Sequence, residues 1–176
     1  MSAAKAVMAA RAAGIHIGVE GDALVLEASA PPPPTTLELL ARHKAAIISW
    51  LRPGADGWSG EDWQAFFDER AGVLEFDAGA PRSEAEANAF ACCISEWLNR
   101  NPVCSPPGCC AGCGAPGTRD QPLLPYGVDK GRSWLHARCW PVWFGEQKRL
   151  AVAALTQMGL PASSESPNDF GKNGGH

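Results

Sequence analysis

The first part of the chain changes from helical to strand-like spacing of apolar positions and back again. Residues 3–13 are rich in alanine and predict a short helix that Gly14 would end. Apolar and polar residues then alternate on both sides of Gly21, which predicts a β-hairpin over residues 15–26. Four prolines at residues 31–34 predict a stiff, extended spacer after the hairpin.

A second helix is predicted directly after the prolines. Thr35 and Glu38 match a Thr-x-x-Glu capping box, in which two side chains satisfy free backbone N–H groups at a helix start. The apolar residues that follow recur at helical spacing: Leu37, Leu40, Ile47, Ile48 and Leu51. Residues 1–52 are therefore expected to form a unit of helix, β-hairpin and helix.

Two amphipathic helices are predicted between residues 57 and 101. The first begins at Ser59, a favourable N-cap residue, and ends near Gly72. The second begins at Ser83, which forms a capping box with Glu86. Both carry an apolar stripe, so we expect them to pair as a helical hairpin with these inward residues: Trp63, Phe66, Phe67, Phe90, Ile94, Trp97 and Leu98.

The aromatic residues of this helical hairpin have a second interpretation. Exposed aromatic rings can stack on the bases of single-stranded nucleic acid, but proteins that use them also interleave Lys and Arg. The neighbours here are acidic, at Asp62, Asp68 and Glu69, so core packing is the favoured interpretation. Cys92 and Cys93 lie in the second helix and are expected to act as small buried apolar residues.

The most informative pattern lies near the C-terminus. Cys110 and Cys113 form a Cys-x2-Cys motif, and His136 and Cys139 form a His-x2-Cys motif after a spacer of 22 residues. Two residues between donors let a tight turn direct both at one ion, and Gly114 is free to adopt positive φ after the second cysteine. Because a catalytic zinc keeps an open position, four donors predict one structural Zn²⁺.

Other interpretations of these cysteines remain open. Cys104 and Cys109 offer different ligand pairings, although the two-residue spacing favours Cys110. The cysteines could also be unliganded, or Cys110 and Cys113 could form a redox pair. A redox motif follows a strand, whereas residues 105–108 before the pair are typical of a loop.

The spacer and the region after it predict further structure. Residues 123–124 and 133–135 predict two short strands, and a helix is expected from Cys139 to about Met158. A zinc knuckle, a hairpin and a helix over residues 104–159 resemble the treble-clef zinc fold. The middle and C-terminal segments also resemble stretches of uncharacterised bacterial proteins, which implies a bacterial origin and no particular activity.

The N-terminal unit resembles a known family. The first helix, the hairpin turn Val-Glu-Gly-Asp at residues 19–22 and the helix segment Leu-Leu-Ala-Arg-His-Lys-Ala-Ala-Ile-Ile at residues 39–48 are similar to the TubC-type N-terminal docking domain. Members cap subunits of peptide and polyketide synthetases and recognise a short C-terminal segment of a partner. The resemblance implies a partner site that uses strand addition at the hairpin residues Ile17, Val19, Leu24 and Leu26. The alternative is a hairpin that only packs on residues 57–101.

Composition and charge narrow the classes of function. A net charge of -4 supplies no general field that attracts nucleic acid, although the segment around the zinc motif is locally basic. Its candidate nucleic-acid contacts are Arg132, Arg138, Lys148 and Arg149. Seven cysteines, an odd number, and the absence of a signal-peptide pattern predict a reducing cytoplasm. No apolar run reaches the roughly 18 residues of a membrane span.

These patterns together predict an α+β protein that is mainly α-helical. Its expected parts are a docking-like unit at residues 1–52, a helical hairpin at 57–101, a zinc-binding unit at 102–160 and a disordered tail at 161–176. No nucleophile with an orienting base is evident, so we expect no catalytic residues. The expected function is a non-enzymatic adaptor that docks a partner peptide. The alternative is a zinc-finger nucleic-acid-binding protein linked to replication or to a mobile element.

Overall fold

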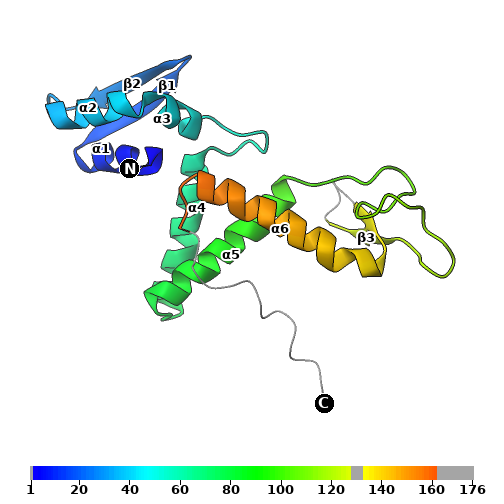
Figure 1. Cartoon of the computed structure of the whole chain (residues 1–176). Helices are drawn as coiled ribbons and strands as arrows, with labels where there is room; N and C mark the ends of the chain where they lie inside the picture. Colours follow the sequence, from blue (N-terminus) through cyan, green and yellow to red (C-terminus); the bar gives the residue numbers. More distant parts are fainter. Residues whose placement is uncertain (1, 128–132, 162–176) are drawn as a thin grey trace.

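The computed structural model describes residues 2–127 and 133–161, and within them it shows an α+β fold dominated by helices (Figure 1). Two small antiparallel sheets, each of two strands, lie at opposite ends of the molecule, with long helices between them. The predicted fold class is therefore confirmed. Of the predicted tail, all but Pro161 lies outside the described residues.

The N-terminal unit is built from a helix, a hairpin and two further short helices. Val7, Ile15 and Ile47 form the fully buried centre of its core, which holds the helices against the hairpin. The elements are α1 (Ala3–Ala12), β1 (Ile15–Glu20), β2 (Ala23–Ala28), α2 (Pro34–Arg42) and α3 (Lys44–Leu51). The two strands pair in the register Ile17 to Leu26 and Val19 to Leu24, around a turn at Gly21 that has a φ of 57°.

The start of α2 differs from the sequence-based prediction. The helix begins at Pro34, with Pro33 at the N-cap and no side-chain capping bond, so the capping box at Thr35 and Glu38 is wrong. Proline suits a first helical position because its missing N–H would have no partner there. The expected single helix also divides at His43 into α2 and α3.

Two long helices form the predicted helical hairpin. Ser59 caps α4 (Gly60–Gly72) and exchanges hydrogen bonds with Asp62, which completes a capping box. A five-residue π-helical turn, η1 (Val73–Asp77), follows α4, and then α5 (Arg82–Arg100) runs back along it. The capping box predicted at Ser83 is wrong, because α5 begins at Arg82 after Pro81 and Glu86 instead accepts a hydrogen bond from Arg82.

The last helix, α6 (Trp140–Gln157), packs its C-terminal half on this helical hairpin. Ala151 and Leu155 of α6 are fully buried in one core with Trp63 and Phe67 of α4. The aromatic residues Trp63 and Phe67 are thus core residues and do not form a stacking surface, as the acidic neighbours indicated. Cys93 is buried in the same core, whereas Cys92 is exposed, contrary to expectation, because it lies on the outer side of α5.

One tryptophan joins the N-terminal unit to the helical core. The indole N–H of Trp50 donates a 2.8 Å hydrogen bond to the carbonyl oxygen of Met158, directly after α6. Gly60, the first residue of α4, lies against the same indole ring so closely that a Cβ would overlap it. The ends of α3 and α6 and the start of α4 therefore meet at Trp50. None of the described helices has the length and apolar character that crossing a membrane requires.

Candidate metal site

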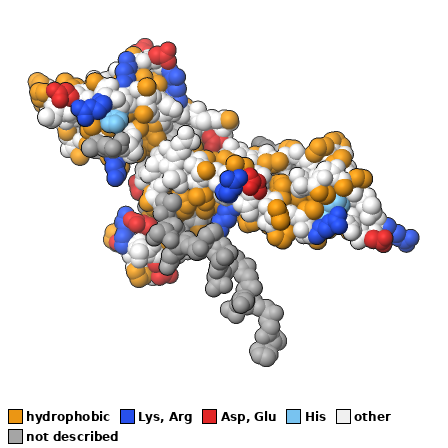
Figure 2. Space-filling view, in the orientation of Figure 1, with side chains coloured by type: hydrophobic (Ala, Val, Ile, Leu, Met, Phe, Trp, Pro, Cys, Tyr) orange, Lys and Arg blue, Asp and Glu red, His pale blue; other side chains and the backbone are white. Residues whose placement is uncertain are grey.

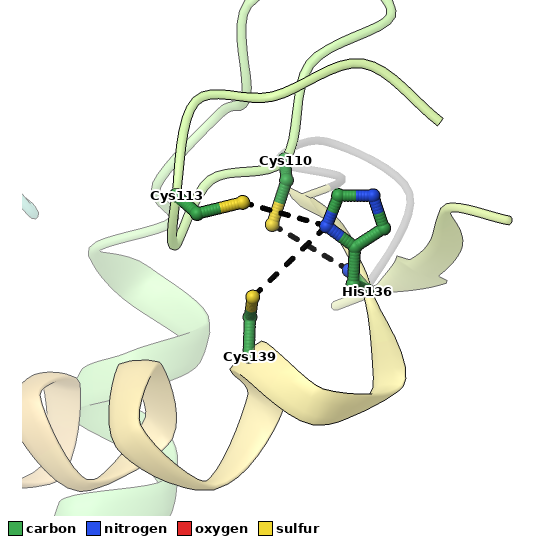
Figure 3. A group of neighbouring side chains, drawn as sticks. All are labelled: Cys110, Cys113, His136 and Cys139. Carbon is green, nitrogen blue, oxygen red and sulfur yellow. Dashed lines mark hydrogen bonds between the residues drawn. The ribbon is translucent and has the colours of Figure 1, made fainter. Parts of the chain in front are cut away.

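The first two donors lie in a tight turn, which we call the knuckle, at residues 110–115. Gly114 donates a 2.8 Å backbone hydrogen bond to the carbonyl of Cys110, and Cys110 in turn donates a 2.9 Å bond to Ala115. Gly114 has a φ of 73°, as predicted from its position after the second cysteine. This backbone arrangement directs both thiols to the same side of the turn (Figure 3).

The second pair of donors lies between a short strand and a helix. β3 (Leu124–Tyr126) pairs with β4 (Ser133–Leu135), and the 3-10 turn η2 (Ala137–Cys139) leads from His136 into α6. The knuckle is attached to β4 by a 2.8 Å hydrogen bond from Ala111 N–H to the carbonyl of Trp134. The strand, the knuckle and the helix start thus place four donors around one point.

The sulfur atoms of Cys110, Cys113 and Cys139 and a ring nitrogen of His136 lie within 4.8 Å of one another. Nδ1 of His136 is 3.4 Å from Sγ of Cys113 and 4.0 Å from Sγ of Cys139 (Figure 3). Cys110 and His136 are buried, with 1% and 3% exposure, while Cys113 is exposed. This Cys3His cluster can hold a metal ion near the surface of the protein.

Backbone N–H groups favour a thiolate at Cys110. Burial alone would raise the pKa of this thiol, but the backbone N–H groups of His136, Cys113 and Gly112 lower the pKa to about 6. The pKa of Cys139 is raised by burial and by the sulfur atoms of Cys113 and Cys110. Metal ligands must be deprotonated, so a cation among the sulfurs would offset this repulsion.

Gly112 is a feature of the site that the sequence analysis did not identify. A Cβ on Gly112 would lie 3.0 Å from the Cβ of Cys139 and 3.5 Å from a methyl carbon of Leu135. The knuckle therefore lies so close to the start of α6 that a side chain at this position would require Cys139 to shift by a few tenths of an ångström. The only signal in the sequence is that one of the two residues between Cys110 and Cys113 is a glycine.

The other cysteines near the site do not belong to the cluster. Cys104 is exposed, and Cys109 forms an isolated β-bridge with Pro116. All seven cysteines of the chain are free, so the structure contains no Cys110–Cys113 disulfide. The four donors that lie close together are those of the Cys-x2-Cys and His-x2-Cys motifs.

The basic residues predicted to contact nucleic acid are not equally available. Arg138 is exposed beside the cluster, and Lys148 is half-buried on α6. Arg149 forms an ion pair with Glu146, at 2.5 Å. Arg132 lies outside the described residues.

The hairpin residues predicted to bind a partner also differ in exposure. Ile17 is only 8% exposed and packs in the N-terminal core, so its side chain cannot contact a partner. Val19 and Leu24 are half-buried, and Leu26 is 36% exposed. The principal contacts of the hairpin are with α1 and α3, and Figure 1 shows it apart from α5. Val25, at 37% exposure, is an accessible residue that the sequence analysis did not name.

No protein-family model matches the chain, and no curated protein or solved structure is significantly similar to it. Its function is therefore argued from its own residues.

Proposed function

We propose that this protein is a non-enzymatic adaptor that binds one structural zinc ion and docks a short peptide of a partner protein on its N-terminal hairpin. Zinc prefers four tetrahedral sulfur and nitrogen donors, and thiolates favour it over harder cations. With bonds of about 2.3 Å to sulfur and about 2.0 Å to nitrogen, tetrahedral geometry separates the two atoms by about 3.5 Å. The separations of 3.4 and 4.0 Å from Nδ1 of His136 are close to this value.

The burial pattern around the knuckle is the observation that carries the structural role. Among residues 101–127, Cys110 alone is buried, and it is one of the four donors. A segment without a hydrophobic core cannot offset the entropy of ordering its backbone, so a metal ion must supply this free energy. Four protein donors also fill the tetrahedral sites and leave no position for a substrate.

Elemental analysis of the purified protein tests the metal site. We expect one zinc per chain in the wild-type protein and none in Cys113→Ser, because the remaining three donors bind zinc less tightly. Cys104→Ser is the matched control, since Cys104 is an exposed cysteine outside the cluster. A wild-type protein without metal under reducing conditions, or a Cys113→Ser protein with full zinc content, would refute the proposal.

The outer edge of β2 supports the docking part of the proposal. Apart from half-buried Leu24, every residue of β2 is exposed, and Val25 and Leu26 add apolar surface beside the strand. An extended peptide can pair with such an edge through backbone hydrogen bonds and place alternate side chains on exposed apolar residues. The resemblance of residues 3–52 to TubC-type docking domains points to the same site.

A displayed library of C-terminal peptides tests docking and requires no identified partner. Peptides selected on the wild-type protein should lose binding to Val25→Lys, because a lysine blunts a strand edge. Val142→Lys is the control, since Val142 is 80% exposed on α6 at the other end of the molecule. Equal binding to both variants would contradict docking at β2 and would leave the zinc proposal untouched.

A further inference from the structure

A groove of about 250 Å³ lies where the end of α5, the connector after it, β3 and the first half of α6 meet. Its walls include the rings of Tyr126, Trp143 and Phe144, and side-chain amides line it at Asn99, Asn101 and Gln147. The described part of the lining contains no Asp, Glu, Lys, Arg or His. Figure 2 shows hydrophobic side chains spread over this end of the molecule. We call the groove lined by these residues the aromatic groove.

Stacking holds the rings of the aromatic groove in place. Tyr126 stacks on Trp140 at a centroid distance of 3.4 Å and meets Trp143 edge-on at 6.3 Å. Trp140 stacks in turn on Phe144 at 4.4 Å. Tyr126 nevertheless keeps 38% of its surface exposed, and Val103 beside it keeps 40%. A partner can therefore cover rigid aromatic surface at little cost in side-chain entropy.

The described lining of the groove disfavours several kinds of occupant. Outside residues 128–132, which the structure does not describe, the lining is neutral and provides no counter-charge for phosphate groups or for an acidic peptide. Strand addition is also unfavourable, because Pro125 in the middle of β3 has no N–H to donate.

A polyproline II segment fits these features. The polyproline II helix has no internal hydrogen bonds, so the carbonyl groups of such a segment stay free. Its proline rings pack on aromatic walls. Asn101 already donates a 3.0 Å bond to the carbonyl of Trp97, whereas the side chains of Asn99 and Gln147 have no hydrogen-bond partner among the described residues. Their amides can donate to the free carbonyls of a bound segment.

The chain itself carries a segment of this kind. Residues 31–34 are four consecutive prolines; Pro34 begins α2, and Pro33 before it has a φ of -59° and a ψ of 136°, as in polyproline II. Pro31 and Pro33 are exposed. Residues 31–33 lead into α2, which lies at the opposite end of the molecule from β3, so they are far from the groove of their own chain (Figure 1).

We propose that the aromatic groove binds the proline segment at residues 31–33 of a second copy of this chain. The contact joins two different surfaces, so a pair of copies keeps one free groove, on one copy, and one free proline segment, on the other. Such a head-to-tail contact extends into chains if the rotation between copies does not close a ring. The adaptor would thereby present several N-terminal hairpins along one assembly.

Sedimentation of the full-length protein over a concentration series tests this assembly. We expect the average mass of the wild type to rise with concentration past that of a dimer. Replacement of Pro31, Pro32 and Pro33 by alanine should abolish the rise, and so should Tyr126→Ala. Because Tyr126 supports Trp140, Gln147→Ala serves as a second groove variant that leaves the stacked rings intact, with zinc content and circular dichroism as checks of folding.

A mixture of two defective variants gives the sharpest test. The proline variant keeps its groove and the Tyr126→Ala variant keeps its prolines, so together they should form a dimer that neither forms alone and that does not grow further. Two controls should associate as the wild type does: alanine at the exposed Pro106 and Pro107, and Phe76→Ala, which removes a 79% exposed ring from η1.

Three results would overturn the proposal. One is a wild-type mass that stays at one chain over the whole concentration range, even if a synthetic peptide of residues 29–35 quenches tryptophan fluorescence. Another is association that survives in both the proline and the groove variants. The third is Tyr126-dependent binding of single-stranded DNA without self-association, which would assign the groove to bases.

Discussion

Gly112 shows how a single residue permits the convergence of four donors. The knuckle packs closely on the start of α6 because this position has no side chain, with the Cβ of Cys139 3.0 Å from where a Cβ would be. Gly114 has a different role, since its φ of 73° closes the turn. Two glycines of one short segment are thus favoured for two different physical reasons, the close packing at Gly112 and the positive φ at Gly114.

Gly112→Ala should weaken metal binding, because the added methyl group pushes Cys139 away from the other donors. Changes around a metal site typically cost 10- to 100-fold in affinity, so we expect at least about a tenfold loss in competition with a chelator. Gly145→Ala is the control, since a Cβ there meets nothing within 4 Å. Unchanged zinc retention in Gly112→Ala would show that the knuckle can move without loss.

The hydrogen bonds between Ser59 and Asp62 predict that the free energy of unfolding depends on pH. Hydrogen bonds from the side chain and then the backbone N–H of Ser59 hold the pKa of Asp62 below its usual range. Because the pKa of Asp62 is lower in the folded than in the unfolded state, its ionised form stabilises the fold at any pH above the pKa of the unfolded state. This stabilisation is lost as the pH falls through the pKa of the folded state. Ser59→Ala should therefore cost about 1 kcal/mol at neutral pH and less below about pH 4. Urea unfolding at both pH values measures this difference, and an equal cost at both would contradict it.

At the scale of elements, a proline set the start of two helices, α2 and α5, where capping sequences predicted a later start. Pro33 and Pro81 precede α2 and α5, and the two capping boxes predicted just after them do not form. Ser59, which has no proline beside it, caps α4 as predicted. A Thr or Ser followed by Glu is therefore a weaker signal when a proline offers an earlier start.

The close contact between Trp50 and Gly60 predicts how a substitution at the start of α4 changes thermal stability. Gly60→Ala should lower the melting temperature, because its methyl group would overlap the indole ring, and such overpacking costs about 1–3 kcal/mol. Gly72→Ala, at the other end of α4, is the control, since a Cβ there has open space and helical φ. We expect it to leave stability unchanged or to raise it by up to about 1 kcal/mol. Similar melting of both variants would mean that Trp50 moves freely.

At the scale of the whole molecule, α6 belongs to two regions at once. Its start follows Cys139, one of the four candidate donors, while Ala151 and Leu155 lie in the core that α4 and α5 build. Trp50 then attaches the end of the helix to the N-terminal unit. The candidate metal site is therefore connected to the helical core through α6.

Removal of the metal should unfold only part of the C-terminal region. A division of the chain at residue 102 would predict loss of structure over all of residues 104–159. Because the second half of α6 shares a core with α4 and α5, we expect hydrogen exchange to speed up in residues 103–139 and to stay slow around Ala151 and Leu155. Fast exchange throughout α6 after chelation would show that the metal also holds this core together.

Local patterns in the sequence determined the fold class, the hairpin, the two long amphipathic helices and the four donors at residues 110, 113, 136 and 139. These features depend on neighbours within a few residues, as periodicity and ligand spacing do. Packing between distant segments decided the rest. It buried Ile17, joined α6 to the helical hairpin, placed Gly112 against Cys139 and formed the aromatic groove from four separate segments. Such contacts depend on how surfaces fit in three dimensions, and no spacing along the chain records that fit.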